Sequence, residues 1–157
     1  MIKTFEQFNE LDPYGEEDWE IDNLPTVIQI ARDQNKPYDQ ITEFWCNDNQ
    51  LTSLDGIENL VNLRWLFCFN NQLTSLDGIE NLVNLRVLWC HDNQLTSLDG
   101  IENLVNLEVL WCHDNQLTSL DGIENLVNLR VLWCSDNQFS NKYKKYIRSL
   151  KIKDTVI

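Results

Sequence analysis

Two histidines, each followed by an aspartate, are the residues of this sequence best suited to chemistry. His91 and His113 lie 22 residues apart and precede Asp92 and Asp114. Imidazole and carboxylate groups together can bind transition metals, and histidines can also act as a pH switch near neutrality. Exposed histidines copied without a role are the commoner explanation, so we keep metal or pH sensing at His91 and His113 as an alternative.

Five cysteines could supply nucleophiles, metal ligands or disulfides. None belongs to a C-x-x-C pair, which argues against a zinc site. Stacked in register, they would have Cα atoms about 4.8 Å apart, a distance that permits a disulfide but with parallel side chains that strain it. Their odd number and the lack of an export signal favour free thiols packed in the core. We expect this of Cys46, Cys68, Cys90, Cys112 and Cys134.

Catalytic arrangements are missing from the sequence. No Ser/His/Asp or Cys/His triad can be recognised, because the cysteines are expected to point inward and the repeated serines belong to a turn. There is no glycine loop of the kind that holds phosphate. We therefore predict that the protein is not an enzyme and needs no cofactor.

An internal repeat positions all of these residues. The string LTSLDGIENLVNL occurs four times at a step of 22 residues, starting at Leu51, Leu73, Leu95 and Leu117. Each repeat combines two periods. The segment from Leu63 to Cys68 ends on a period of two, which is typical of a strand. Apolar residues then recur every third position, which suits turns or 3₁₀ helix.

The pattern L-x-x-L-x-C-x-x-N-x-L that begins at Leu63 resembles the leucine-rich repeat. The 22-residue length is similar to that of bacterial internalins and of eukaryotic phosphatase regulators. The resemblance implies an α/β solenoid, a right-handed coil with a parallel sheet on its concave face and short 3₁₀ or turn segments on its convex face. It also implies recognition of a protein or peptide through the concave face.

A solenoid needs covered ends, and the sequence divides accordingly. We predict an acidic N-terminal helical cap over 1–40, five repeats over 41–138, and a basic C-terminal cap helix and tail over 139–157. Within the first cap, helical spacing predicts a helix over 23–34, and a further one over 1–9. In the last segment Ser140 can cap a helix whose apolar stripe is Phe139, Tyr143, Tyr146, Ile147 and Leu150.

Two repeated polar positions have structural explanations. An asparagine in each coil is expected to turn inward and bind backbone groups of neighbouring coils; these residues are Asn49, Asn71, Asn93, Asn115 and Asn137. In the segment from Asp55 to Glu58, the aspartate is expected to cap a helical turn and the glutamate to reach back to it, as in a capping box.

The outward side of the predicted strands carries the strongest functional signal. If Leu66 and Cys68 point inward, alternate residues must point outward. This places on the outward face Trp45, Trp65, Phe67, Phe69, Trp89, His91, Trp111, His113 and Trp133, with Asp92, Asp114 and Asp136 at its rim. A contiguous apolar strip usually marks an interaction site, and tryptophan is common at interface hot spots. We predict that this face binds a protein or peptide.

Two alternatives to a distinct ligand stay open for the same face. The aromatic rings could only stack and stabilise neighbouring strands, since such pairs contribute roughly 0.2–1 kcal/mol each. They could instead mediate self-association into a homo-oligomer. Either would make the protein a structural or self-associating repeat protein.

The charge of the chain limits its partners. The net charge is −13, and an acidic surface argues against nucleic acid and anionic membranes. The chain has no run of about 18 apolar residues that could span a membrane, and its polar, acidic start does not resemble a secretory signal. We therefore expect a cytoplasmic protein.

Overall fold

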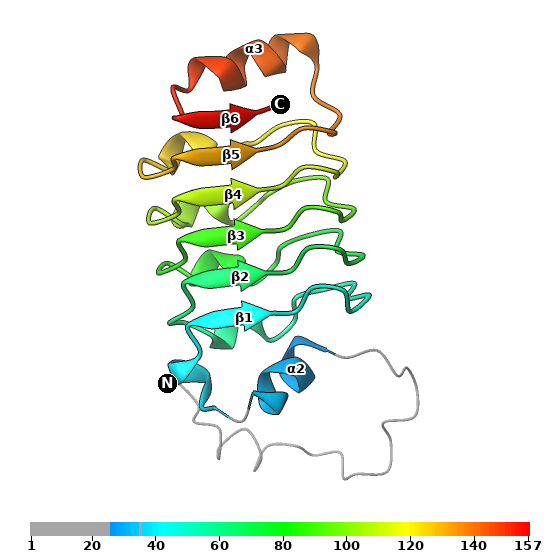
Figure 1. Ribbon diagram of the computed structural model, residues 1–157, viewed down its shortest axis with the longest axis vertical. Coiled ribbons are helices and arrows are strands. Elements are labelled where there is room, and N and C mark those ends of the chain that lie inside the picture. The colour runs from blue at the N-terminus through cyan, green and yellow to red at the C-terminus, as the bar shows by residue number, and fades with distance from the viewer. Residues whose placement is uncertain (1–25, 35) are drawn as a thin grey trace.

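The computed structural model describes residues 26–34 and 36–157, which form one stack of coils (Figure 1). Six parallel strands make one sheet in chain order. Within the repeats each residue pairs with the one 22 positions later, so Leu66 lies beside Leu88. The strands are β1 (Glu43–Trp45), β2 (Trp65–Phe67), β3 (Val87–Trp89), β4 (Val109–Trp111), β5 (Val131–Trp133) and β6 (Asp154–Val156).

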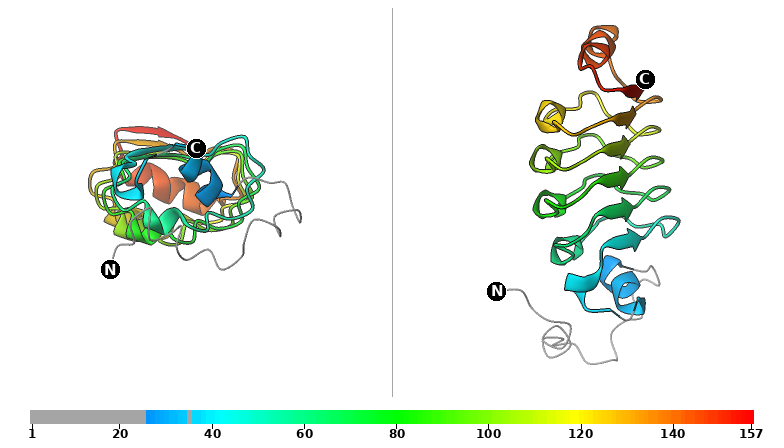
Figure 2. Two further views of the ribbon diagram at one scale, coloured as in Figure 1. Left: turned by 90° about the horizontal axis from the view of Figure 1, so that it is seen from below. Right: turned by 60° about the vertical axis from the view of Figure 1, so that its left-hand side comes forward.

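Each coil returns through a short 3₁₀ turn on the side opposite the sheet (Figure 2). A left-handed glycine precedes each turn; Gly78 has φ of 94°. A Cβ atom there would lie 3.0 Å from Ile57 Cγ2 of the preceding coil, so the position needs glycine for both conformation and space. The turns are Ile57–Asn59, Ile79–Asn81, Ile101–Asn103 and Ile123–Asn125.

The capping box expected at these turns was wrong. The Oε2 atom of Glu58 accepts a hydrogen bond of 2.9 Å from the N–H of Gly56, and not from that of Asp55. Glu80 binds Gly78 in the same way. Since the glycine itself is the cap residue of the turn, the first free N–H is its own, one residue later than the capping-box pattern places it.

The core is a continuous column of leucine, isoleucine and cysteine side chains enclosed by the coils. Leu66, Leu88 and Leu110 are fully buried, and so are all five cysteines, which are free thiols. Burial raises the pKa of the Cys46 thiol to about 12. It also raises that of Cys68, to which the adjacent thiols add. The thiols therefore remain neutral and pack as apolar groups.

The inward asparagines connect successive coils. The Oδ1 atom of Asn71 accepts from the backbone N–H of Asn49 and of Leu51, at 3.1 and 2.9 Å. Its Nδ2 atom donates to the carbonyls of Cys46 and Cys68, at 2.9 and 3.0 Å. One side chain thus satisfies backbone groups on two coils, which the tight turn after each strand would otherwise leave buried and unpaired.

Helix α2 (Val27–Asp33) lies at the N-terminal end of the stack (Figure 1). Thr26 caps it by accepting from the N–H of Gln29 at 3.2 Å, and Val27 and Ala31 are buried. The structure thus begins the helix later than the predicted start at residue 23. The helix expected over 1–9 lies outside the described residues. No helix in the described part of the chain is long and apolar enough to cross a membrane.

Helix α3 (Asn141–Ser149) and strand β6 close the other end (Figure 1). Ser140 caps α3 by accepting from the N–H of Tyr143 at 3.1 Å, and the hydroxyl of Tyr143 accepts from the N–H of Leu120 at 2.7 Å. Strand β6 was not expected from the sequence. It pairs with β5, and the backbone N–H of Cys134 donates to the carbonyl of Val156 at 2.8 Å. The C-terminal tail thus supplies hydrogen-bond partners for backbone groups at the open edge of β5.

Replacing Cys46 by alanine should make alkaline pH less destabilising. The thiol pKa is raised to about 12 in the folded chain, so above pH 9 the unfolded chain ionises first. The stability that the neutral thiol contributes is present below that pH and is lost above it, by about 1.4 kcal/mol per pH unit. Urea unfolding at pH 8, 9 and 10 should show the difference between wild type and Cys46→Ala shrinking little between pH 8 and 9 and approaching this slope towards pH 10.

The exposed-site variant Val127→Ala provides the control, because Val127 is 81% exposed and its effect should not change with pH. A wild-type to Cys46→Ala difference that stays constant between pH 8 and 10 would show that the thiol titrates alike in both states.

Replacing Asn115 by alanine should destabilise the fold by about 3 kcal/mol or more, because several buried backbone groups lose their partner. Its amide binds the N–H of Leu95 and the carbonyls of Cys90, Cys112 and His113. The matched control is Gln116→Ala, an exposed neighbour expected to cost less than about 0.5 kcal/mol. Urea unfolding measures both, and equal costs would contradict this role.

Candidate functional site

The outward side chains of the strands form one surface, here called the aromatic face. It consists of Trp45, Trp65, Phe67, Phe69, Trp89, His91, Trp111, His113 and Trp133. The alternation along β2 to β5 places Leu66 and its equivalents in the core and the neighbouring residues on the other side. Because the register is the same in every coil, equivalent residues lie side by side in columns.

The central column is a ladder of aromatic rings. Trp45 stacks on Phe67 with ring centroids 3.9 Å apart, and Phe67 meets Trp89 edge-on at 4.7 Å. Trp89 and Trp111 are nearly parallel at 4.2 Å, and Trp111 meets Trp133 edge-on at 5.4 Å. Both arrangements are favoured for aromatic pairs, so the ladder stabilises the sheet in addition to providing an apolar surface.

Exposure is uneven along the ladder. Trp45 is 50% exposed, whereas Phe67 is only 6% exposed because the larger indoles on either side cover it. The expectation that Phe67 contacts a partner directly is therefore wrong: it supports the two tryptophans that can. Trp89, Trp111 and Trp133 are half-buried.

A second column of rings runs beside the ladder. Phe69 stacks on His91 with centroids 4.7 Å apart, and His91 stacks on His113 at 4.4 Å. His113 in turn lies 4.2 Å from the ring of Trp133. The histidines were expected to be exposed, but His113 is only 9% exposed. The flat imidazoles fill the space between larger rings, which sequence spacing alone does not reveal.

Some polar atoms of these columns have no hydrogen-bond partner in the described part of the chain. They are Nε1 of Trp89, Nε1 of Trp111 and Nδ1 of His91, all buried. In the last repeat, by contrast, Trp133 Nε1 donates to the hydroxyl of Ser135 at 2.9 Å. Histidine replaces this serine in the two middle coils, so the acceptor is lost there.

Burial lowers the pKa of His91, and the adjacent His113 lowers it further, against the opposing effect of Asp92 and Asp114. Two stacked imidazoles do not readily carry charge together. His91 is therefore neutral at physiological pH and adds no charge to the aromatic face.

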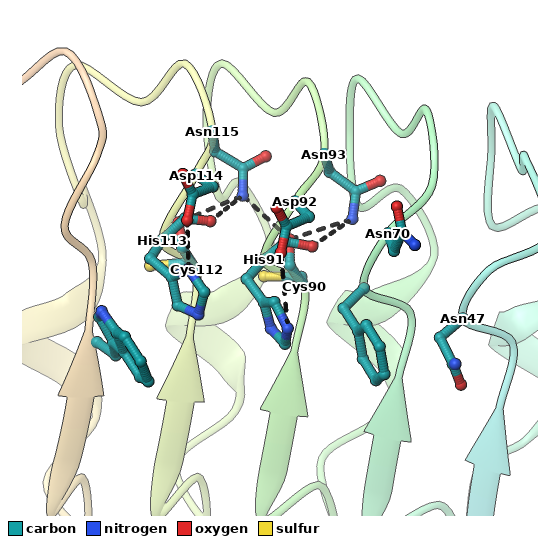
Figure 3. Close-up of polar contacts among 12 residues, drawn as sticks. Asn47, Asn70, Cys90, His91, Asp92, Asn93, Cys112, His113, Asp114 and Asn115 are labelled. Carbon is teal, nitrogen blue, oxygen red and sulfur yellow. Dashed lines mark hydrogen bonds and ion pairs between the residues drawn. The ribbon is translucent and has the colours of Figure 1, made fainter.

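Acidic side chains line one side of the aromatic face. This aspartate rim consists of Asp48, Asp92, Asp114 and Asp136, with Asn70 in the equivalent position of the second coil. All five residues are left-handed, with φ between 51° and 59°, a conformation that aspartate and asparagine tolerate better than most residues. His113 Nδ1 lies 2.7 Å from the carboxylate of Asp114. Figure 3 shows this pair beside His91 and Asp92.

The opposite side of the aromatic face carries one acidic and two basic side chains that lie close together. Glu108 lies 3.0 Å from Arg86 and 4.0 Å from Arg130. The three come from successive coils, so one carboxylate serves two cations. The sequence analysis did not find this pairing, although the exchange of arginine for glutamate in a single coil is the signal that could have shown it.

One group of residues could hold a metal ion. Possible ligand atoms of Asp92, His113 and Asp114 all lie within 4.8 Å of one another. The residues that the sequence offers as a metal-binding pair are His91 and His113, whereas the structure brings His113 together with Asp92 and Asp114.

Comparison with known proteins agrees with this architecture. A family model described as leucine-rich repeats, in two copies, matches residues 61–103 and 105–144, more than half of the chain. None of the curated proteins compared with the chain is significantly similar to it.

Several solved structures are similar. A leucine-rich-repeat protein of Leptospira interrogans is 34% identical with a TM-score of 0.69, over 74% of this chain and 31% of that one. An internalin, InlF of Listeria monocytogenes, is 26% identical with a TM-score of 0.67, over 74% and 34%. The functional domain of InlJ from the same species, which includes a cysteine ladder, is 35% identical with a TM-score of 0.62, over 65% and 22%. The chain thus spans about a third or less of these proteins.

Trp45 should be the described tryptophan most accessible to a collisional quencher, because it is half exposed whereas Trp111 is covered on both sides. We expect Trp45→Phe to lower the Stern–Volmer constant for acrylamide, and the matched variant Trp111→Phe to leave it unchanged. Phenylalanine is tolerated in this column at Phe67. Equal decreases in the two variants would contradict the uneven exposure of the ladder.

Proposed function

This chain belongs to the leucine-rich-repeat family, and we propose that its aromatic face binds an extended segment of another protein. The observation that carries the proposal is the row of tryptophan rings on the outer side of the sheet, from Trp45 to Trp133. The two described helices lie over the ends of the stack and leave this side of the sheet free (Figure 2). Leucine-rich-repeat proteins of the internalin type generally bind other proteins, which supports the proposal.

The size of the ladder matches a short peptide. Five rings at about 4.8 Å per strand extend over roughly 19 Å, the length of about six residues of an extended chain. Alternate side chains of such a segment would face the rings. Tryptophan is frequent among interface residues that contribute most binding energy, because it buries a large apolar area in a rigid side chain.

The charges indicate the chemistry of the partner. No lysine or arginine within the described ranges forms an ion pair with the aspartate rim, whereas on the opposite side Glu108 is paired with Arg86 and Arg130. A partner with apolar or aromatic residues flanked by lysine or arginine would complement both surfaces. Such complementarity mainly increases the association rate and the specificity.

Self-association through the aromatic face is the alternative. It would bury the same rings, but it would also bring two aspartate rims and two chains of net charge −13 together. That repulsion is why we favour a distinct, basic partner. We also propose that the protein is not an enzyme. The cytoplasmic location stays a proposal, supported by the five free thiols.

Selection of peptides from a random library on the full chain should enrich short segments with apolar residues flanked by basic ones. We expect Trp89→Ala and Trp111→Ala each to weaken the selected peptides at least about tenfold, equal to about 1.4 kcal/mol. Binding should weaken with added salt. Isothermal titration calorimetry measures the affinities.

The matched control is Val127→Ala, an exposed apolar residue beside a 3₁₀ turn on the other side of the coil, which should bind like wild type. Peptides that bind the Trp111→Ala variant with unchanged affinity would refute the proposed site. Sedimentation that shows a concentration-dependent mass, abolished by Trp111→Ala, would replace it with self-association.

A further inference from the structure

The ends of β3 and β4 bring together three side chains at the border between the aromatic face and the aspartate rim. Asp92 follows β3, and His113 and Asp114 follow β4 (Figure 3). Their nearest possible ligand atoms lie within 4.8 Å of one another. We propose that Asp92, His113 and Asp114 bind one divalent transition-metal ion of the zinc type. These three residues are called the ligand set below.

The histidine of the ligand set is held in place by its neighbours. The ring of His113 lies between the ring of His91, at 4.4 Å, and that of Trp133, at 4.2 Å, and the residue is only 9% exposed. A ring held in this way loses little freedom when it binds an ion. A preorganised ring of this kind favours metal binding, and an ion bound between His113 and Asp114 would replace their contact of 2.7 Å.

The backbone beneath the ligand set is also fixed. The N–H of Asp92 donates to the carbonyl of His113 at 3.2 Å, and the N–H of Asp114 donates to that of Ser135 at 3.2 Å. The buried amide of Asn115 donates to the carbonyl of His113 at 3.1 Å. The two carboxylates therefore start from neighbouring turns of the same shape and are held at the spacing of adjacent strands.

The first two coils provide an internal comparison. There the equivalent pair is Asp48 and Asn70, and the amide of Asn70 donates a hydrogen bond to the carboxylate of Asp48. In the third and fourth coils both residues are aspartates, which cannot donate to each other when ionised. Among the described residues, only histidine side chains form ion pairs with these two carboxylates. A cation between the carboxylates of Asp92 and Asp114 would offset their repulsion. In the first two coils no cation is needed, because the neutral amide of Asn70 binds the carboxylate of Asp48.

His91 is the next residue beside the ligand set. Its Nε2 atom lies 3.8 Å from the carboxylate of Asp92, and its buried Nδ1 atom has no partner in the described part of the chain.

The donor set indicates the class of ion. One imidazole nitrogen with two carboxylate oxygens suits zinc, nickel or cobalt, whereas calcium takes six to eight oxygen ligands. Asp92 and Asp114 are exposed on the solvent side, so water can complete the coordination. The ion would also reduce the negative charge of the aspartate rim, next to the aromatic face.

Zinc titration of the full chain by isothermal titration calorimetry tests the site without any peptide partner. We expect one ion per chain, and we expect His113→Phe and Asp92→Asn each to weaken binding at least about tenfold. Both substitutions copy residues already present at equivalent positions, Phe69 and Asn70, so ring stacking and the turn are preserved. Thermal unfolding without metal checks that each variant folds.

Two matched control variants each remove an imidazole or a carboxylate that lies outside the ligand set. His91→Phe and Asp136→Asn should each change zinc affinity less than about threefold, because they alter only the surroundings of the ion. Cobalt, which reports coordination through its visible absorption, should give a spectrum in wild type that His113→Phe abolishes. This spectrum distinguishes a nitrogen ligand at position 113 from general attraction to the acidic surface.

The proposal is overturned if zinc binds wild type, His113→Phe and Asp92→Asn alike, or if no zinc binds. It is also overturned if calcium binds as tightly as zinc and His113→Phe has no effect, since the site would then be an acidic surface only. None of these results bears on peptide binding by the tryptophans, so the two proposals fail independently.

Discussion

The inward asparagine of the second to fifth coils is the interaction on which the rest of this structure depends. Its side chain binds backbone groups on two successive coils at once, as Asn71 does with the N–H of Leu51 in the first coil and the carbonyl of Cys68 in the second. A chain that turns after a strand of only three residues would otherwise bury unpaired polar groups. The amide geometry also fixes the distance and direction from one coil to the next.

A fixed register turns every position of the repeat into a column of neighbouring side chains. Apolar columns pack as core, and the thiol column stays neutral because ionised thiols would be both buried and adjacent. On the outer face the same register places Trp89 against Trp111 and His91 against His113, and their rings stack. It also places Asp92 beside Asp114, which is unfavourable for two anions. The proposed binding properties are therefore consequences of repetition, and they differ along the stack only where one copy differs from the next.

The sequence predicted the architecture because its signals are periodic. The 22-residue step and the alternation of Leu66 with its neighbours were enough to assign inward and outward columns, and the capping position of Ser140 followed from local chemistry. The failures have a common cause, since they depend on contacts between columns or on backbone detail. Phe67 is buried by larger rings from other coils, and strand β6 exists because the exposed edge of β5 accepts it. The glutamate of the first three turns binds the glycine N–H because the cap lies one residue later than its pattern indicates.

The differences between copies show where this surface is specialised. The second coil carries Phe69 with Asn70, whereas the third and fourth carry histidine with aspartate, and the last carries Ser135 with Asp136. Each pair is locally consistent: the amide satisfies a carboxylate in the second coil, and the serine satisfies an indole in the last. In the third and fourth coils the indole Nε1 atoms have no acceptor, because histidine replaces the serine. Aspartate also replaces the amide donor there, and only histidine side chains lie near the carboxylates. Unsatisfied polar groups on a rigid scaffold are costly unless something binds them, and they gather here at the centre of the face, where a ligand would make the most contacts.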